Sequence, residues 1–139
     1  MCRFSTVLPA LLTVAACADN PAAPTVPAGR EFQLRAGETV AVEGTDLAVR
    51  FEQVASDSRC PADAICVTLG DAEAVFTVTG LGRPASRVTL HTGPAEAQRA
   101  TVGDFTLTLT QLDPYPYSGR AISPSDYRAS LRVDRTTAF

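Results

Sequence analysis

The stretch FTLTLT, at residues 105–110, alternates strictly between apolar and threonine side chains. Successive side chains of a β-strand point to opposite faces, so this alternation predicts a strand that turns Phe105, Leu107 and Leu109 toward a core. Threonine is β-branched and fits the exposed, pleated face of a sheet. The stretch therefore predicts a strand that is buried on one face only.

The same two-residue period recurs along the chain, in runs that are separated by Gly, Pro and Asp. These runs cover residues 32–34, 40–42, 47–54, 74–79, 87–91 and 127–133. A change of phase at Val54 predicts a bulge near Glu52-Gln53. About seven or eight short strands, each with one polar face, predict an all-β fold. We expect an antiparallel two-layer sandwich, with a small β-barrel as the alternative.

The start of the chain has the pattern of an export signal. Arg3 precedes an apolar stretch over residues 4–16, which is shorter than the roughly 20 residues of a membrane-spanning helix. We expect residues 1–16 to be a cleaved signal peptide. There are two alternatives. One is an ordinary signal peptide in which Cys17, the residue after the apolar stretch, has no special role, and the other is a short membrane anchor.

The sequence VAAC, at residues 14–17, resembles the lipobox of bacterial lipoproteins, in which an aliphatic residue and two small residues precede an obligatory cysteine. The resemblance implies cleavage before Cys17, a diacylglycerol on its thiol and an acylated amino group. Two or more acyl chains hold a protein on a membrane for long times. The implied location is the cell envelope, with the membrane as partner. In enterobacterial lipoproteins, an Asp directly after the cysteine favours retention in the inner membrane. This chain has Ala18 at that position, which favours the outer membrane if the host has one.

The segment after this cysteine differs in composition from the rest of the chain. Residues 18–29 read ADNPAAPTVPAG and show no apolar period. Such a Pro- and Ala-rich stretch predicts an extended linker. We therefore expect a lipidated cysteine and tether at 17–29, the sandwich at 30–135 and a C-terminal tail at 136–139.

Charge and composition argue against several classes of function. Twelve Arg and no Lys stand against 15 Asp and Glu, for a net charge of −3. A nucleic-acid surface needs clustered positive charge, so we expect no nucleic-acid partner. The chain has one histidine, His91, and no nucleophile motif, phosphate-binding loop or calcium loop. We expect no catalytic residue, no metal and no cofactor, and a surface position for His91.

Two cysteines remain for the folded domain once Cys2 leaves with the signal peptide and Cys17 carries lipid. An even pair in an exported chain predicts a disulfide between Cys60 and Cys66. The disulfide would staple the connection between two strands. A rigid partner-binding loop is the alternative, and a redox or metal pair is disfavoured because the spacing is not C-x-x-C.

The surrounding block, DSRCPADAICVTLGDA at residues 57–72, resembles one in uncharacterised bacterial secreted lipoproteins. That block reads D-S-R-C-P, four residues, then C-V-x-x-G-x-A. An aromatic residue often stands two places after its second cysteine, where this chain has Thr68. The resemblance carries no activity, and it implies compartment and architecture only.

Polar residues of this block are expected to fix its conformation. Asp57 and Ser58 can accept hydrogen bonds from nearby backbone N–H groups. Arg59 can pair with Asp57, Asp63 or Asp71, and it is also a candidate partner contact.

The longest irregular segment, DPYPYSGRAISPSD at residues 113–126, contains the other candidate contacts. Tyr and Arg are favoured at binding hot spots, which singles out Tyr115, Tyr117 and Arg120. Long loops on rigid β scaffolds often carry binding function. The alternative is that the two rings cover the open end of the sandwich.

These features predict a membrane-anchored lipoprotein of the cell envelope that acts as a non-catalytic binding or structural module, whose partner is an envelope protein or a ligand. The alternative is a small inhibitor or ligand-binding domain that presents the disulfide loop or the tyrosine loop. An enzyme is the least favoured class.

Overall fold

The computed structural model describes residues 22–137, which form nine strands and two short 3₁₀ helices. The elements in chain order are β1 (Thr25–Val26), β2 (Glu31–Arg35), β3 (Thr39–Val42), β4 (Ala48–Asp57), β5 (Ala72–Gly80), β6 (Arg83–His91), η1 (Ala95–Gln98), β7 (Arg99–Val102), β8 (Phe105–Asp113), η2 (Pro124–Asp126) and β9 (Arg128–Arg135).

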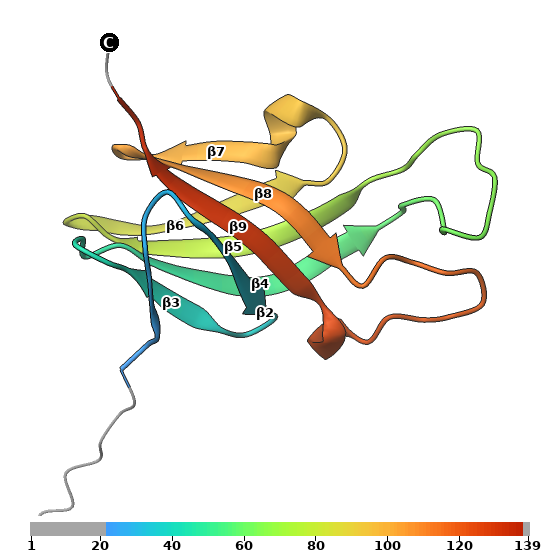
Figure 1. Ribbon diagram of the computed structural model, residues 1–139, viewed down its shortest axis with the longest axis horizontal. Helices are drawn as coiled ribbons and strands as arrows, with labels where there is room; N and C mark the ends of the chain where they lie inside the picture. Colours follow the sequence, from blue (N-terminus) through green and yellow to red (C-terminus); the bar gives the residue numbers. More distant parts are fainter. Residues whose placement is uncertain (1–21, 138–139) are drawn as a thin grey trace, which may run out of the picture.

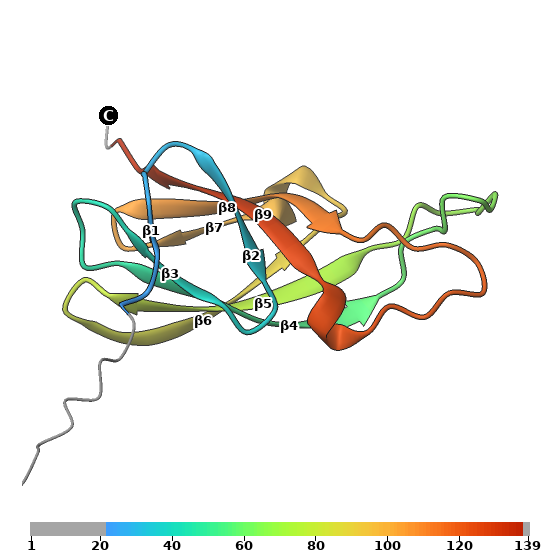
Figure 2. The same ribbon diagram turned by 60° about the horizontal axis from the view of Figure 1, so that its bottom comes forward.

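The strands form two sheets that pack face to face (Figures 1 and 2). One sheet has the order β1-β3-β4-β5-β6 and the other β2-β9-β8-β7. Every neighbouring pair is antiparallel except β1 and β3. The predicted sandwich is confirmed. The barrel alternative is wrong, because the two sheets do not close on each other.

The core lies between the sheets and follows the predicted phase of the strands. In β8, Phe105, Leu107 and Leu109 are each at most 5% exposed, whereas the threonines between them are half-buried. The rings of Phe51 and Phe76 stack with their centroids 5.0 Å apart. Burial of such side chains contributes about 1.5–3 kcal/mol each, so these alternating runs drive the folding of the domain.

The predicted bulge in β4 is confirmed, since the register with β5 shifts between Phe51 and Gln53. A second shift in β4, between Val54 and Ser56, was not predicted. Another shift occurs in β8 between Leu109 and Gln111, opposite β9. Bulges bend a strand and increase its twist. They lie in the halves of β4 and β8 that lead to the long loops.

Two strands were missing from the sequence prediction. Strand β7 has four residues, of which only Ala100 and Val102 pack partly against the core, so its hydrophobic signal is short and weak. Strand β1 lies inside the predicted tether at 17–29. Its backbone is paired, because the N–H of Ala41 donates to the carbonyl of Pro24 and the N–H of Glu43 to that of Val26, both at 2.9 Å. The folded domain therefore begins earlier than the predicted residue 30.

The two long loops lie at the end of the sandwich opposite the chain ends (Figures 1 and 2). They connect β4 to β5 and β8 to β9. The predicted signal peptide and Cys17 lie outside the described residues. Within residues 22–137, no helix has the length and apolar character needed to cross a membrane.

Candidate functional site

The connection between β4 and β5 is a hairpin loop over residues 58–71. Strand pairing continues past the last residues of both strands. The N–H of Ser58 donates to the carbonyl of Asp71 at 2.7 Å, and the N–H of Cys60 donates to the carbonyl of Leu69 at 2.8 Å. The base of the loop is thus held by the same kind of hydrogen bonds as the sheet.

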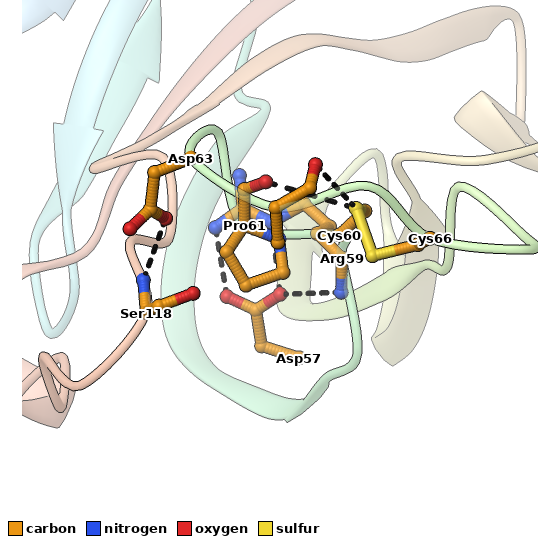
Figure 3. The surroundings of a disulfide bond; sticks show 8 residues. Asp57, Arg59, Cys60, Pro61, Asp63, Cys66 and Ser118 are labelled. Atoms are coloured by element: carbon orange, nitrogen blue, oxygen red, sulfur yellow. Dashed lines mark hydrogen bonds and ion pairs between the residues drawn. A yellow bond between two sulfur atoms is a disulfide. The ribbon is translucent and has the colours of Figure 1, made fainter.

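Cys60 and Cys66 form a disulfide with their Cα atoms 6.0 Å apart, as predicted (Figure 3). The closed ring contains few residues. In the chain-entropy model, closing a loop of this size stabilises the folded state by about 2–3 kcal/mol. The disulfide therefore restricts the outer part of the loop, beyond the reach of the strand pairing.

The opposite side of the loop base requires a glycine. Gly70 has a φ of +70°, and a Cβ atom at this position would lie 1.8 Å from the carbonyl oxygen of Ser58. Only glycine permits both this conformation and this approach. The hydroxyl of Ser58 accepts from the N–H of Asp71 at 3.2 Å and donates to its carbonyl at 2.9 Å, so Ser58 fixes the turn as expected.

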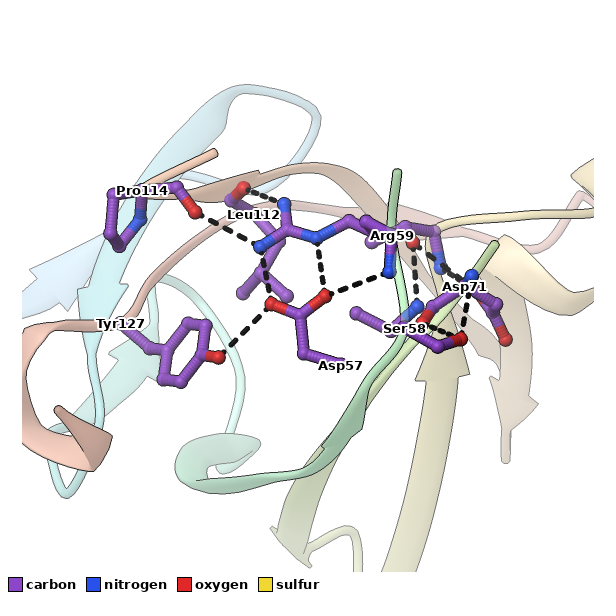
Figure 4. Close-up of polar contacts among 9 residues, drawn as sticks. Asp57, Ser58, Arg59, Asp71, Leu112, Pro114 and Tyr127 are labelled. Carbon is purple, nitrogen blue, oxygen red and sulfur yellow. Dashed lines mark hydrogen bonds and ion pairs between the residues drawn. The ribbon is translucent and has the colours of Figure 1, made fainter. Parts of the chain in front are cut away.

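Arg59 clamps the two loops together from a buried position (Figure 4). Its guanidinium donates to both carboxylate oxygens of Asp57, at 2.9 and 2.7 Å. The same group donates to the carbonyl of Leu112 at 2.6 Å and to that of Pro114 at 2.9 Å. Of the three carboxylates considered from the sequence, Asp57 is the partner of Arg59.

This position corrects the expectation that Arg59 contacts a partner. Arg59 is 8% exposed, and its guanidinium is occupied by Asp57 and two backbone carbonyls. It also lies over the ring of Tyr115, 5.2 Å from the ring centroid. Arg59 is therefore a structural clamp that holds the disulfide loop against the β8–β9 loop.

The clamp changes the titration of two groups. Partial burial alone would raise the pKa of Asp57. The hydrogen bonds and positive charge of Arg59, together with a hydrogen bond from Tyr127, have the larger effect, so the pKa of Asp57 lies below its ordinary value. The hydroxyl of Tyr127 donates to Asp57 at 3.0 Å. Burial, together with the hydrogen bond and negative charge of Asp57, raises the pKa of Tyr127 to about 12. The pair is stable as a carboxylate and a neutral phenol.

Two further hydrogen bonds join the loops nearer their tips. The N–H of Ala62 donates to the carbonyl of Pro116 at 2.9 Å, and the N–H of Ser118 donates to the carboxylate of Asp63 at 2.8 Å. The loops are thus bonded to each other through residues 62–63 of one and 116–118 of the other, and Figure 3 shows the bond between Asp63 and Ser118. Two segments far apart in sequence form one braced unit.

This unit exposes three aliphatic side chains, which we call the apolar ridge: Ile65, Val67 and Leu69. Ile65 and Val67 are fully exposed and Leu69 is 84% exposed. Tyr115 and Tyr117 on the neighbouring loop are about half exposed, at 49% and 51%. The exposed large apolar side chains of residues 22–137 thus all lie on these two loops.

The apolar ridge was not predicted from the sequence. Its signal was the two-residue period of ICVTL at residues 65–69, which the cysteine spacing obscured. Arg120, a predicted contact, is exposed in the tip of the β8–β9 loop, where its N–H donates to the carbonyl of Tyr117 at 3.2 Å. The structure gives no hydrogen bond between Arg120 and the disulfide loop in the described part of the chain.

His91 lies beside Asp71 at the base of the disulfide loop. Its Nδ1 is 2.5 Å from a carboxylate oxygen of Asp71, whose other oxygen accepts from the N–H groups of Thr92 and Gly93. Burial alone would raise the pKa of Asp71. The hydrogen bonds from His91 and Gly93 have the larger effect, so the pKa of Asp71 lies below its ordinary value. No hydroxyl or thiol bonds to His91 among residues 22–137, so the pair lacks an adjacent nucleophile.

The described part of the chain contains no group of three or more His, Cys, Asp or Glu residues positioned to hold a metal ion. Comparison with known proteins adds no further assignment. No family model, curated protein or solved structure matches this chain.

Proposed function

We propose that the protein is a lipid-anchored binding module of the cell envelope and that the apolar ridge is its contact surface for an envelope protein. The observation that carries this proposal is the nearly complete exposure of Ile65, Val67 and Leu69 on a loop that is braced at its base, its middle and its tip.

The energetics favour contact with a partner. Burial of a fully exposed aliphatic side chain contributes about 1.5–3 kcal/mol, so the ridge can supply several kcal/mol to an interface. The conformational entropy lost on binding is small when a loop is already ordered. The disulfide, Gly70 and the Arg59 clamp provide that order before any partner arrives.

The position of the ridge fits a membrane anchor. The first described residues lie at the end of the sandwich far from the loops (Figures 1 and 2). A lipid on Cys17, eight residues before β1, would hold that end near the membrane and direct the ridge away from it. Anchoring also raises the local concentration, which makes an interaction of modest affinity effective.

Photo-crosslinking in the native envelope tests the contact surface. We replace Tyr117, which is half exposed on the loop that is bonded to the disulfide loop, with p-benzoyl-phenylalanine. The control carries the same probe at Arg83, which is exposed in the β5–β6 hairpin. The proposal predicts one defined protein adduct from position 117 and none from position 83. Equal adducts from both positions, or none from position 117, would overturn it.

Mass spectrometry of the protein from its own host tests the anchor separately. We expect a mature chain that begins at Cys17 and carries the added mass of acyl chains. An intact Met1, or a chain cleaved elsewhere without acyl mass, would overturn the lipid anchor while leaving the contact surface to be judged by crosslinking.

A further inference from the structure

One edge of β8 is only partly paired. Strand β9 pairs with β8 along its whole length, from Phe105 to Asp113. On the other side, β7 pairs only with residues 105–108. In the part of the chain that the structure describes, no strand pairs with that edge of β8 beyond Thr108. The carbonyl of Leu112 in this stretch is already occupied, because it accepts from Arg59 at 2.6 Å. The remaining backbone groups that residues 109–112 turn to this edge can pair with a further strand.

The path of the chain explains why no strand of the described residues pairs with this edge of β8 beyond Thr108. Residues that would extend β7 along β8 form η1 instead, so the strand pairing on this side of β8 ends at Thr108. The side-chain amide of Gln98, the last residue of η1, donates to the carbonyls of Thr92 and Gly93 at 3.2 and 2.9 Å. These bonds hold η1 against the end of β6 and leave the space beside β8 open.

A cleft of about 360 Å³ occupies this space. It runs along residues 109–112 of β8, and Leu69 of the ridge and Tyr115 line it from the two loops. Leu109 and Leu112, each 3% exposed, are its most buried apolar side chains. Arg59 is its one charged lining residue, and that charge is already paired with Asp57.

We propose that this cleft binds an extended polypeptide segment of the partner, which adds to the sheet as a strand beside β8. Unpaired backbone groups along a strand are complementary to another extended chain, and such strand addition is a recurring mode of peptide recognition. The lining is neutral apart from the paired Arg59, so the segment that fits carries uncharged aliphatic or β-branched side chains.

This inference rests on the proposed function and names the form in which the partner is recognised. Leu69 belongs to both the ridge and the cleft, whereas Val67 belongs to the ridge but not to the cleft. A partner that covers the ridge is therefore placed to send a segment into the cleft. The difference between these two residues also supplies a matched pair of variants.

Hydrogen exchange of the full processed chain in detergent, with acetyl-Thr-Val-Thr-Val-Thr-amide as the probe, tests the proposal. The peptide should slow exchange in residues 109–113, and methylation of its alternate backbone nitrogens should weaken binding about tenfold or more, because the backbone bonds are lost. L69N should weaken binding to a similar degree, whereas V67N should leave it unchanged.

Three results would overturn the proposal. These are no protection of residues 109–113, equal binding of the methylated peptide, or protection that rises with protein concentration when no peptide is present. The last result would assign the cleft to a second copy of the chain. None of them bears on the adduct expected from position 117, so failure of this inference can be distinguished from failure of the proposed function.

Discussion

Strand β8 and the apolar ridge have the same alternation of apolar and other side chains, but in opposite environments. The apolar side chains of residues 105–109 in β8 are at most 5% exposed, whereas those of the ridge are at least 84% exposed. In β8 the second sheet covers the apolar face. At the ridge no element of the described chain covers the apolar side chains, although the disulfide and the bonds of residues 59–63 hold the loop.

The difference teaches that a two-residue period does not by itself tell whether a segment forms a strand or whether another element covers its apolar side chains, since residues 65–69 bend at 67–68 and are exposed throughout. Burial in β8 stabilises the fold. The exposed side chains of the ridge do not stabilise the fold, so they are available to contact a partner. Substitutions in the two regions, and in the clamp between them, should therefore separate stability from binding.

The largest effect on stability should come from the clamp. Arg59→Met removes the charged partner of Asp57 and leaves this largely buried carboxylate with hydrogen bonds only from the Tyr127 hydroxyl and the backbone N–H of residue 59. Removal of one partner of a buried ion pair typically costs about 3–5 kcal/mol. Chemical denaturation should show this loss. The matched control is Arg120→Met, where the side chain is exposed and the expected change is below about 0.5 kcal/mol. Equal losses would mean that the clamp is not what joins the loops.

A truncation in β8 should cost slightly less. Leu107→Ala leaves a cavity between the sheets, so we expect a loss of about 2–5 kcal/mol in the free energy of unfolding. Thr108→Ala, one residue along on the outer face, should change it by less than about 0.5 kcal/mol. A larger loss for Thr108→Ala would show that the strand phase is wrong by one residue.

Removal of the disulfide should have an intermediate effect. Replacement of both Cys60 and Cys66 with serine should lower the free energy of unfolding by about 2–3 kcal/mol, because the unfolded chain gains freedom. Thermal unfolding with and without reductant checks this. If reductant destabilised the double variant as much as the natural chain, the disulfide would not be the source of the loss.

A smaller effect is expected from pH. The pKa of Asp57 is lowered in the folded protein, so its contribution to stability is present above the ordinary value of 3.8 and is lost as the pH falls through the lower, folded value. The pKa of Tyr127 is raised to about 12, so its contribution is lost as the pH rises from its ordinary value of 10.0 toward 12.

Tyr127→Phe isolates the alkaline part of this profile. The variant lacks the titrating phenol and should lose less stability between pH 10.0 and about 12 than the natural chain. Denaturant titrations at several pH values provide the measurement. Parallel profiles for the two proteins would contradict the assignment of the alkaline loss to Tyr127.

Much of the sandwich could be predicted from the sequence, because alternation in segments such as 105–110 reports directly which face is buried. The disulfide followed from the count of cysteines. β7 was not predicted, since its four residues bury only Ala100 and Val102 in part, and β1 was hidden by its proline-rich surroundings. The burial of Arg59 depends on carbonyls of Leu112 and Pro114, more than 50 residues away in sequence. No local pattern reports such a contact.

The most direct test of the central claim compares the natural chain with I65S/V67S, each carrying the photo-crosslinking probe at position 117. We expect the double variant to unfold within about 0.5 kcal/mol of the natural chain, because both side chains are already exposed. The yield of adduct per folded molecule should fall about tenfold or more, since the buried apolar contact is lost. An unchanged yield from a folded double variant would contradict the account.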